Sequence, residues 1–153
     1  NLNRVQTGLQ QVLPTANLLG KPTLILQGRD DALAPVNFSG RFYFGLNQVT
    51  QGTSSKVSYI EVKNAHHLDA LNQRYNIDSE VPIQYYFHQA LDKMYDTLKN
   101  KAALPSSQVL PTKPLSSTPT SATLAKETNL PSIGSSSACA ISFSSGVLNI
   151  PEC

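Results

Sequence analysis

An aspartate and a histidine follow two neighbouring strands that the sequence predicts. The apolar run at residues 23–27 leads into Asp31, and the alternating run at residues 56–62 leads into His67. An acyl-transfer triad needs an imidazole that takes a proton from the nucleophile and returns it to the leaving group, and a carboxylate that holds the imidazole in the correct tautomer. We therefore take Asp31 as the candidate acid and His67 as the candidate base.

Each candidate has a neighbour of the same type. Asp30 precedes Asp31 and His66 precedes His67, so the spacing alone leaves both choices open. A structural role is the simpler interpretation of an aspartate after a strand, because such residues commonly cap the next turn. His88 falls on the polar side of a predicted long helix, which indicates a solvated side chain.

The nucleophile that such a pair would serve is missing, because the sequence contains no Gly-x-Ser-x-Gly motif. In α/β-hydrolases the triad runs along the chain in the order nucleophile, acid, histidine, and here one helix and one strand separate the acid from the histidine. We therefore expect the serine and the oxyanion hole upstream of Asn1, in a longer protein of which this chain is the C-terminal segment. The segment alone should not turn over substrate.

Three predicted elements place the acid and the histidine at one edge of a sheet. Residues 23–27 suit a strand buried on both faces, residues 36–48 suit an amphipathic helix, and residues 56–62 suit a second strand. Asn37 or Ser39 lies near the start of the helix. This order predicts a right-handed βαβ unit, whose parallel strands end at the same edge.

The loop after the first strand carries turn residues. Gly28 lets the chain turn sharply as it leaves the sheet, and Pro35 helps to fix the loop before the next helix. The resulting spacing, Gly-x-x-Asp-x-x-x-Pro, is common in the acid loop of α/β-hydrolases. It favours a catalytic interpretation of Asp31.

A long amphipathic helix is predicted over residues 81–101. Its large apolar residues recur at spacings of three and four: Ile83, Phe87, Leu91, Met94 and Leu98. Asp78 or Ser79 can cap this helix, and Pro82 falls in the first turn, which tolerates proline. The helix should cover one face of the sheet, and a shorter helix is predicted within residues 3–19.

The last third of the chain changes to proline, serine and threonine with few large apolar residues. Such a stretch cannot bury enough surface to offset its chain entropy, so residues 104–137 are predicted to be a flexible linker. The linker would join the catalytic part, residues 1–103, to a terminal β-hairpin, residues 138–153. The hairpin would bring Cys139 near Cys153, and a disulfide between them would indicate an oxidising compartment.

The overall composition excludes several classes of partner. The chain has 153 residues, a mass of 16.6 kDa, a formal net charge of +2 and only 14% charged residues. It therefore offers neither a basic face for nucleic acid nor an acidic field for cations. Its two cysteines lie outside metal-binding spacing, and no apolar run approaches the length of a bilayer span. We expect no metal, no cofactor, no nucleic-acid partner and no membrane partner.

Several segments also carry a resemblance to a known family: residues 20–23 (Gly-Lys-Pro-Thr), 28–37, 43–47 and 62–70. They resemble the C-terminal part of bacterial D-3-hydroxybutyrate oligomer hydrolases over residues 1–104, with a weaker likeness in the terminal hairpin. The resemblance implies the C-terminal portion of an α/β-hydrolase fold. It also implies a secreted or periplasmic serine esterase that cleaves short oligomers of 3-hydroxybutyrate, which are small-molecule esters, to monomer.

The resemblance places the acid and the base at Asp31 and His67. The family tends to have glutamine before the catalytic histidine, whereas this chain has His66 at that position. No residue of the chain matches the motif of the nucleophile, which the family carries in the preceding part of its sequence.

Two other functions fit part of the pattern. Tannase-like and feruloyl-esterase-like enzymes share the same sheet, acid loop and histidine loop. A non-catalytic accessory module with a linker and a terminal hairpin is the alternative from another class. An acid and a base at two successive strand ends argue against it, because a binding module needs neither.

Overall fold

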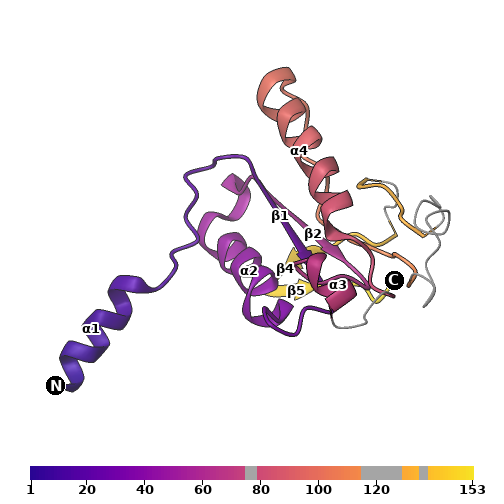
Figure 1. Ribbon diagram of the computed structural model, residues 1–153. Coiled ribbons are helices and arrows are strands. Elements are labelled where there is room, and N and C mark those ends of the chain that lie inside the picture. The colour runs from indigo at the N-terminus through magenta and orange to yellow at the C-terminus, as the bar shows by residue number, and fades with distance from the viewer. Residues whose placement is uncertain (75–78, 115–128, 135–137) are drawn as a thin grey trace.

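A three-stranded parallel sheet lies at the centre of the computed structural model (Figure 1). The strands follow in the order β1 (Thr23–Gly28), β2 (Val57–Val62) and β3 (Gln108–Leu110). β1 and β2 pair in parallel along their whole length. The predicted α/β class is confirmed, as is the pairing of the two strands that lead into Asp31 and His67. The structure describes residues 1–74, 79–114, 129–134 and 138–153.

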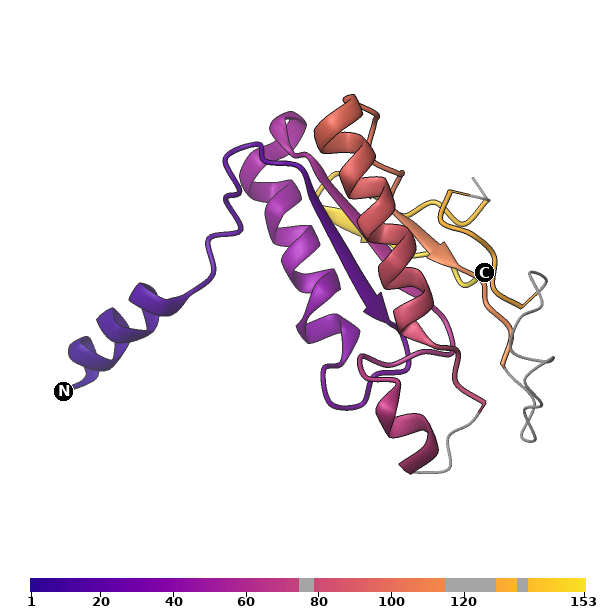
Figure 2. The same ribbon diagram turned by 45° about the horizontal axis from the view of Figure 1, so that its top comes forward.

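One long helix packs on each face of the sheet (Figure 2). On one face, Phe44 of α2 (Gly40–Gln51) stacks on Tyr59 of β2 with 5.7 Å between the ring centroids. On the other face, Tyr86 of α4 (Ile83–Asn100) shares an apolar cluster with Ile60. Successive side chains of β2 therefore enter two separate clusters, as expected for a strand that is buried on both faces.

The helix predicted over residues 36–48 is divided in two. A single 3-10 turn, η1 (Val36–Phe38), precedes α2, and neither of the predicted residues near its start gives α2 a side-chain cap. Instead the Gly40 N–H donates to Oε1 of Gln27, a residue of β1, at 2.7 Å. The cap comes from the sheet, so no local window of sequence around the helix start contains it.

The long helix predicted over residues 81–101 is present as α4, but the predicted cap at Ser79 was wrong. Ser79 gives no cap, and Asp78 lies outside the described residues. Asp69 takes the role, because its two carboxylate oxygens accept the N–H groups of Ile83 at 2.7 Å and Gln84 at 3.0 Å. A negative charge at a helix N-terminus also interacts favourably with the helix dipole.

Part of the predicted linker belongs to the folded core, so the prediction for residues 104–137 was wrong there. β3 pairs in parallel with the end of β2, and all three of its residues are buried. Leu130 and Ile133 are buried in the cluster beneath α4. The average composition of the segment did not reveal that these residues are buried. A three-residue strand such as β3 is stabilised by a partner far away in sequence, here β2. Residues 115–128 and 135–137 lie outside the described part of the chain.

The C-terminal residues pack against the sheet. β4 (Ser142–Ser144) and β5 (Val147–Asn149) pair antiparallel, and Cys139 forms a disulfide with Cys153 across a Cα separation of 5.9 Å. The Val109 N–H donates to the Cys139 carbonyl at 2.9 Å, which places this segment along β3. A single isolated antiparallel bridge, between Gln108 and Ala140, thus joins the C-terminal segment to the edge of the three-stranded sheet.

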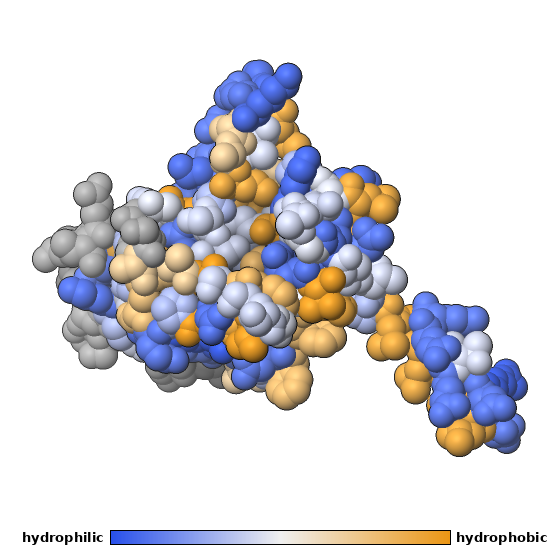
Figure 3. Space-filling model, turned by 180° about the vertical axis from the view of Figure 1, so that it is seen from behind, coloured by the Kyte–Doolittle hydropathy of each residue, from blue (hydrophilic) through white to orange (hydrophobic). Residues whose placement is uncertain are grey.

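The remaining helices are short or stand apart: α1 (Leu2–Val12), η2 (Gly52–Ser54) and α3 (Ala70–Arg74). α1 projects away from the sheet and buries none of its residues (Figure 1). Apolar side chains therefore remain on its surface, as they do along part of α4 (Figure 3). None of the helices in the described ranges is long and apolar enough to cross a membrane.

Candidate active site

Asp31 and His67 face each other across the loops that follow β1 and β2. Oδ2 of Asp31 lies 2.6 Å from Nδ1 of His67. The Asp31 side chain is 1% exposed, whereas the His67 side chain is 44% exposed. None of the described residues hydrogen-bonds to Nε2 of His67, so this nitrogen can accept a proton from an approaching group. The sequence-predicted acid and base are thus brought together as a hydrogen-bonded pair.

The other oxygen of Asp31 organises its own loop. Oδ1 accepts the N–H groups of Leu33 and Ala34, both at 2.9 Å. Burial alone would raise the pKa of Asp31, but the hydrogen bonds from Ala34, His67 and Leu33 outweigh it and lower that pKa. The carboxyl group is therefore ionised at neutral pH. An ionised carboxylate against Nδ1 fixes the tautomer of the imidazole and stabilises its protonated form.

The loops of the acid and the histidine are joined through their backbones. The Arg29 N–H donates to the Val62 carbonyl at 2.7 Å, and the Asp30 N–H donates to the Ala65 carbonyl at 3.0 Å. Gly28 permits this approach, because a Cβ on it would lie 2.2 Å from the Ala65 carbonyl oxygen. The sequence pattern predicts a sharp turn at Gly28. Its φ is not in the left-handed region, and close backbone approach is the actual requirement.

Thr112, a residue of the predicted linker, forms hydrogen bonds that hold the histidine loop in place. Asn64 has a φ of 52°, a left-handed conformation that asparagine tolerates better than most residues. Its side-chain amide donates to the carbonyl of Thr112 at 2.8 Å and to the hydroxyl of Thr112 at 3.1 Å. The Thr112 hydroxyl in turn donates to the Lys63 carbonyl. Thr112 follows β3, so the third strand fixes the loop that carries His67.

The neighbouring candidates take other roles. Asp30 is exposed, and His66 is buried with both of its ring nitrogens engaged. The Leu68 N–H donates to Nδ1 of His66 at 3.2 Å, and Nε2 of His66 bonds to Oδ1 of Asn72. His66 thereby stabilises the loop. His88 lies on the exposed side of α4, 3.2 Å from the Gln84 amide.

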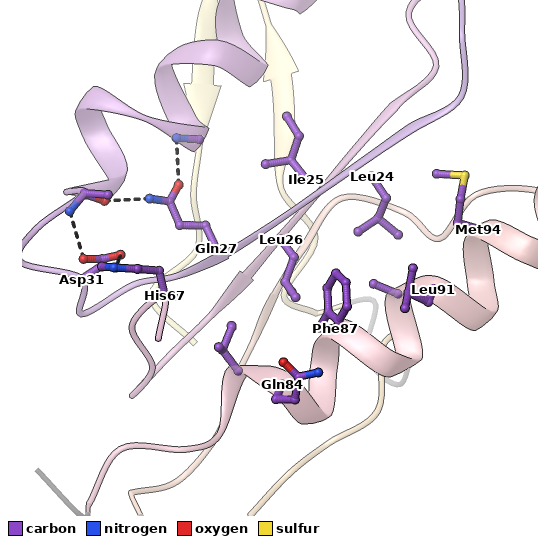
Figure 4. A pocket seen from close by; sticks show the side chains of 15 residues that line it. Leu24, Ile25, Leu26, Gln27, Asp31, His67, Gln84, Phe87, Leu91 and Met94 are labelled. Atoms are coloured by element: carbon purple, nitrogen blue, oxygen red, sulfur yellow. Dashed lines mark hydrogen bonds and ion pairs between the residues drawn. The ribbon is translucent and has the colours of Figure 1, made fainter. Parts of the chain in front are cut away.

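An open groove of about 580 Å³ begins at the Asp31–His67 pair and runs between β1 and α4. Its apolar lining includes Leu24 and Leu26 from β1 and Phe87 and Leu91 from α4 (Figure 4). The carboxylate and the imidazole lie at one end of this lining (Figure 4). The Asp31–His67 pair therefore lies at one end of an apolar surface between β1 and α4.

A buried cluster of charges behind the pair was missed in the sequence. Glu61 of β2 is fully buried and accepts hydrogen bonds from Arg29, Arg41 and the Tyr59 hydroxyl. Burial alone would raise the pKa of Glu61, but these three donors lower it, so the carboxyl is held as a carboxylate. The available signal was a glutamate in the same strand row as Val57 and Tyr59, where apolar residues predominate.

In the described ranges, no three histidine, cysteine, aspartate or glutamate side chains gather in a way that could hold a metal ion. The chemistry that the described side chains offer is proton transfer. It comes from Asp31 and His67, and the described serines form no hydrogen bond to His67.

Comparison with known proteins identifies the family. A family model described as 3HB-oligomer hydrolase (3HBOH) matches residues 1–152. The chain belongs to this family. The resemblance found in the sequence is confirmed, and the match of the 3HB-oligomer hydrolase family extends through the C-terminal β4–β5 pair.

Curated relatives carry the same family's name. The chain is 46% identical to a D-(-)-3-hydroxybutyrate oligomer hydrolase of Albidiferax ferrireducens, over 99% of this chain and 22% of that protein. It is 45% identical to the protein of that name from Polaromonas naphthalenivorans, with the same coverage, and 46% identical to that from Paraburkholderia xenovorans over 90% of this chain and 20% of that protein. The chain thus spans about a fifth of the length of these 3HB-oligomer hydrolases. No solved structure matches it.

Proposed function

We propose that this chain supplies the acid and the base of a serine esterase that hydrolyses D-3-hydroxybutyrate oligomers to monomer. The observation that carries the proposal is the 2.6 Å contact between Asp31 Oδ2 and His67 Nδ1, which leaves Nε2 open beside an apolar groove. The acid follows β1 and the histidine follows the adjacent parallel strand β2. This is the order of an α/β-hydrolase, and we assign the chain to the C-terminal part of that fold.

In the proposed mechanism, His67 moves the protons and Asp31 holds it in place. Nε2 takes the proton of a serine hydroxyl as the serine oxygen attacks the ester carbonyl, and the imidazolium then gives that proton to the departing hydroxybutyrate oxygen. A water molecule repeats the cycle on the acyl-enzyme and releases the acid. The serine and the oxyanion hole would lie in parts of the longer relatives that this chain does not cover.

The substrate and the compartment rest on separate observations. The relatives' printed names give the substrate as an oligomer of 3-hydroxybutyrate, and the apolar lining of the groove fits its methyl-bearing carbon chain. The disulfide between Cys139 and Cys153 supports a secreted or periplasmic location, because disulfides persist in oxidising environments.

Variants of the full-length hydrolase test the triad roles. Asp31→Ala and His67→Ala should each lower kcat for a 3-hydroxybutyrate trimer by about 10³-fold or more. Asp30→Ala is the matched control, because this neighbouring carboxylate is exposed and should leave kcat within about twofold of wild type. Unchanged turnover by correctly folded Asp31→Ala and His67→Ala variants would favour the accessory-module interpretation.

Substrate selectivity separates the proposed function from another esterase of the same fold. The full-length protein should release monomer from dimers and trimers of 3-hydroxybutyrate. It should release no product from aryl esters of gallate or ferulate. The opposite preference would assign it to the tannase-like or feruloyl-esterase-like enzymes.

A further inference from the structure

The buried charge cluster connects three elements immediately behind the Asp31–His67 pair. Glu61 lies one residue before the end of β2, Arg29 is the first residue after β1, and Arg41 lies in the first turn of α2. Both arginines bond to the Glu61 carboxylate: Arg29 through Nε, and Arg41 through Nε at 2.7 Å and Nη2 at 2.6 Å. Buried charges are tolerated when they are paired in this way. Removal of one partner leaves the other as a buried charge without compensation, which is strongly destabilising.

Arg29 also binds the C-terminal tail, which we define as residues 151–153. Its Nη2 donates to the Pro151 carbonyl at 3.2 Å, and its Nη1 lies 3.8 Å from the Glu152 carboxylate. Lys63, the residue that follows β2, donates through Nζ to the Glu152 carbonyl at 3.0 Å. The tail therefore contacts the first residue of the acid loop and the first residue of the histidine loop.

The disulfide anchors this tail to the sheet. Cys153 is bonded to Cys139, whose carbonyl accepts the Val109 N–H of β3 at 2.9 Å. Cys153 thus fixes the tail to the segment that is bonded to β3, while Pro151 and Glu152 contact the loops of the acid and the histidine. Arg29 joins the tail to the acid loop, because its side chain binds the tail and its backbone lies two residues before Asp31.

The described hydrogen bonds and ion pairs of the Arg29 side chain go to Glu61, Pro151 and Glu152, and not to Asp31 or His67. Any effect of Arg29 on the pair must therefore pass through its backbone. Its N–H continues the β1–β2 ladder to Val62, and the next N–H, of Asp30, reaches the Ala65 carbonyl. A displacement of Arg29 would shift Asp31 relative to His67. Small displacements of catalytic groups cost large factors in rate, because productive geometry is narrow.

We propose that Arg29 is a positioning residue that transmits the anchorage of the disulfide-bonded C-terminal tail to the acid loop and so sets the Asp31–His67 geometry. This inference rests on the proposed function, since it assumes that the pair is catalytic. It assigns a role in turnover to the last residues of the chain, which lie far in sequence from the acid and the base.

Kinetics of the full-length hydrolase with a 3-hydroxybutyrate trimer test the proposal. Arg29→Met should lower kcat by about 10- to 100-fold with KM within about twofold, because geometry is lost while the substrate surface is intact. Labelling of the nucleophilic serine by a fluorophosphonate should slow by a similar factor. Arg29→Lys keeps the charge and should recover part of both losses.

Arg41→Met is the matched control. It removes two hydrogen bonds from the same buried carboxylate. Arg41 lies on α2, its other described hydrogen bond goes to Asn37 of η1, and none of its described hydrogen bonds reaches the tail or residues 29–35 of the acid loop. This variant should lower the melting temperature about as much as Arg29→Met does and keep kcat within about threefold. Equal losses of kcat in both variants, in proportion to their loss of stability, would reduce Arg29 to a structural residue.

A double-mutant comparison tests the link to the tail. Cys153→Ser should lower kcat about 3- to 10-fold, and adding it to Arg29→Met should lower kcat little further, because both changes break one path of contacts. Fully multiplicative effects would disprove the link. Full activity of a folded Arg29→Met variant, while Asp31→Ala is inactive, would overturn this inference alone. An active Asp31→Ala variant would overturn the proposed function.

Discussion

The two oxygens of Asp31 have different tasks. Oδ2 pairs with His67, and Oδ1 accepts two backbone N–H groups of its own loop. The second task explains why Asp31, and not Asp30, points at the histidine: the two N–H bonds form a tight turn that closes over the carboxylate. The same residue therefore builds the loop and serves the proposed chemistry.

Asp31→Asn separates these two tasks. The amide oxygen can still accept the loop N–H groups, but the negative charge that stabilises the imidazolium is lost, and an amide N–H toward Nδ1 would favour the wrong tautomer. We expect kcat of the full-length hydrolase to fall by about 10⁴-fold, with a much smaller change in melting temperature. Trimer hydrolysis and thermal denaturation provide the two measurements. A melting temperature that collapses together with kcat would show that the charge is chiefly structural.

At this scale the position after each strand predicted an acid and a histidine, but that position alone could not choose between Asp31 and Asp30 or between His67 and His66. Each candidate follows a strand, and that position is a local property which the pattern reveals. Which of two adjacent side chains faces the partner depends on the turn that closes over the Asp31 carboxylate and on a side-chain contact with His67, 36 residues away in sequence. His66 illustrates the limit, because its buried position depends on a bond to Asn72 in the following helix.

The elements that carry the pair are held together at Gly28. β1 and the histidine loop approach so closely there that a Cβ would lie 2.2 Å from the Ala65 carbonyl oxygen and 2.7 Å from the His66 Cα. Gly28→Ala should therefore lower the free energy of unfolding by about 1–3 kcal/mol and displace His67, with a loss of kcat. Urea denaturation and trimer hydrolysis measure the two effects.

Gly45→Ala is the control for Gly28→Ala. Gly45 lies inside α2, and a Cβ on it meets no described atom within 4 Å. Alanine is about 1 kcal/mol more favourable than glycine in a helix, so this variant should be as stable as wild type or more so. Equal behaviour of the two variants would contradict the close-approach explanation.

Glu61 of β2 binds Arg29, which follows β1, and Arg41 of α2. The free energy of unfolding should therefore depend on the protonation of Glu61 and so on pH. Its folded-state pKa is lowered, since Arg41, Arg29 and Tyr59 outweigh the effect of burial. Its stabilising contribution is therefore complete above the unfolded-state value of 4.5 and is lost as the pH falls through the lower folded value.

Melting temperatures measured between pH 3 and pH 7 test this dependence. Wild type should lose stability steeply on the acid side, because protonation of Glu61 leaves two guanidinium groups without their carboxylate. Glu61→Gln should be less stable at neutral pH and show a shallower acid limb. Parallel curves for the two proteins would show that other carboxylates govern the acid limb.

Elements with a strong periodic pattern were predictable from the sequence, and those that depend on distant partners were not. The position of α4 and the alternation of β2 are visible in the pattern of apolar residues, and β2 is buried on both faces. The face that α4 buries was not predicted correctly, because Tyr86 and Ala90 are buried whereas Phe87, Leu91 and Leu98 of the predicted apolar face are exposed. β3 has three residues within a stretch rich in proline and serine, and only its pairing with β2 gives it a strand's hydrogen bonds. The helix caps supplied by Gln27 and Asp69 have the same non-local origin.

At the scale of the whole molecule, residues 138–153 form a disulfide-closed clasp that packs on the face of the sheet covered by α2. The disulfide closes a loop with a sequence separation of 14, and Ile141 and Leu148 pack in the cluster that contains Phe44 and Tyr59. An isolated hairpin is marginally stable in water, so this packing and the disulfide together account for its order. The stability of the sheet is thereby connected to the last residues of the chain.

Removing both cysteines tests how strongly this clasp stabilises the fold. A cross-link over a loop of this length restricts the unfolded chain and contributes about 3 kcal/mol in the chain-entropy account. The Cys139→Ser, Cys153→Ser double variant should lose about 2–3 kcal/mol of unfolding free energy in urea, and limited proteolysis should cut its last 15 or so residues faster than those of wild type. Wild type treated with reductant should match the double variant, which separates loss of the bond from effects of the serine side chains. If cleavage of the C-terminal residues proceeds at the wild-type rate in the double variant, packing alone holds the clasp and the disulfide adds nothing to it.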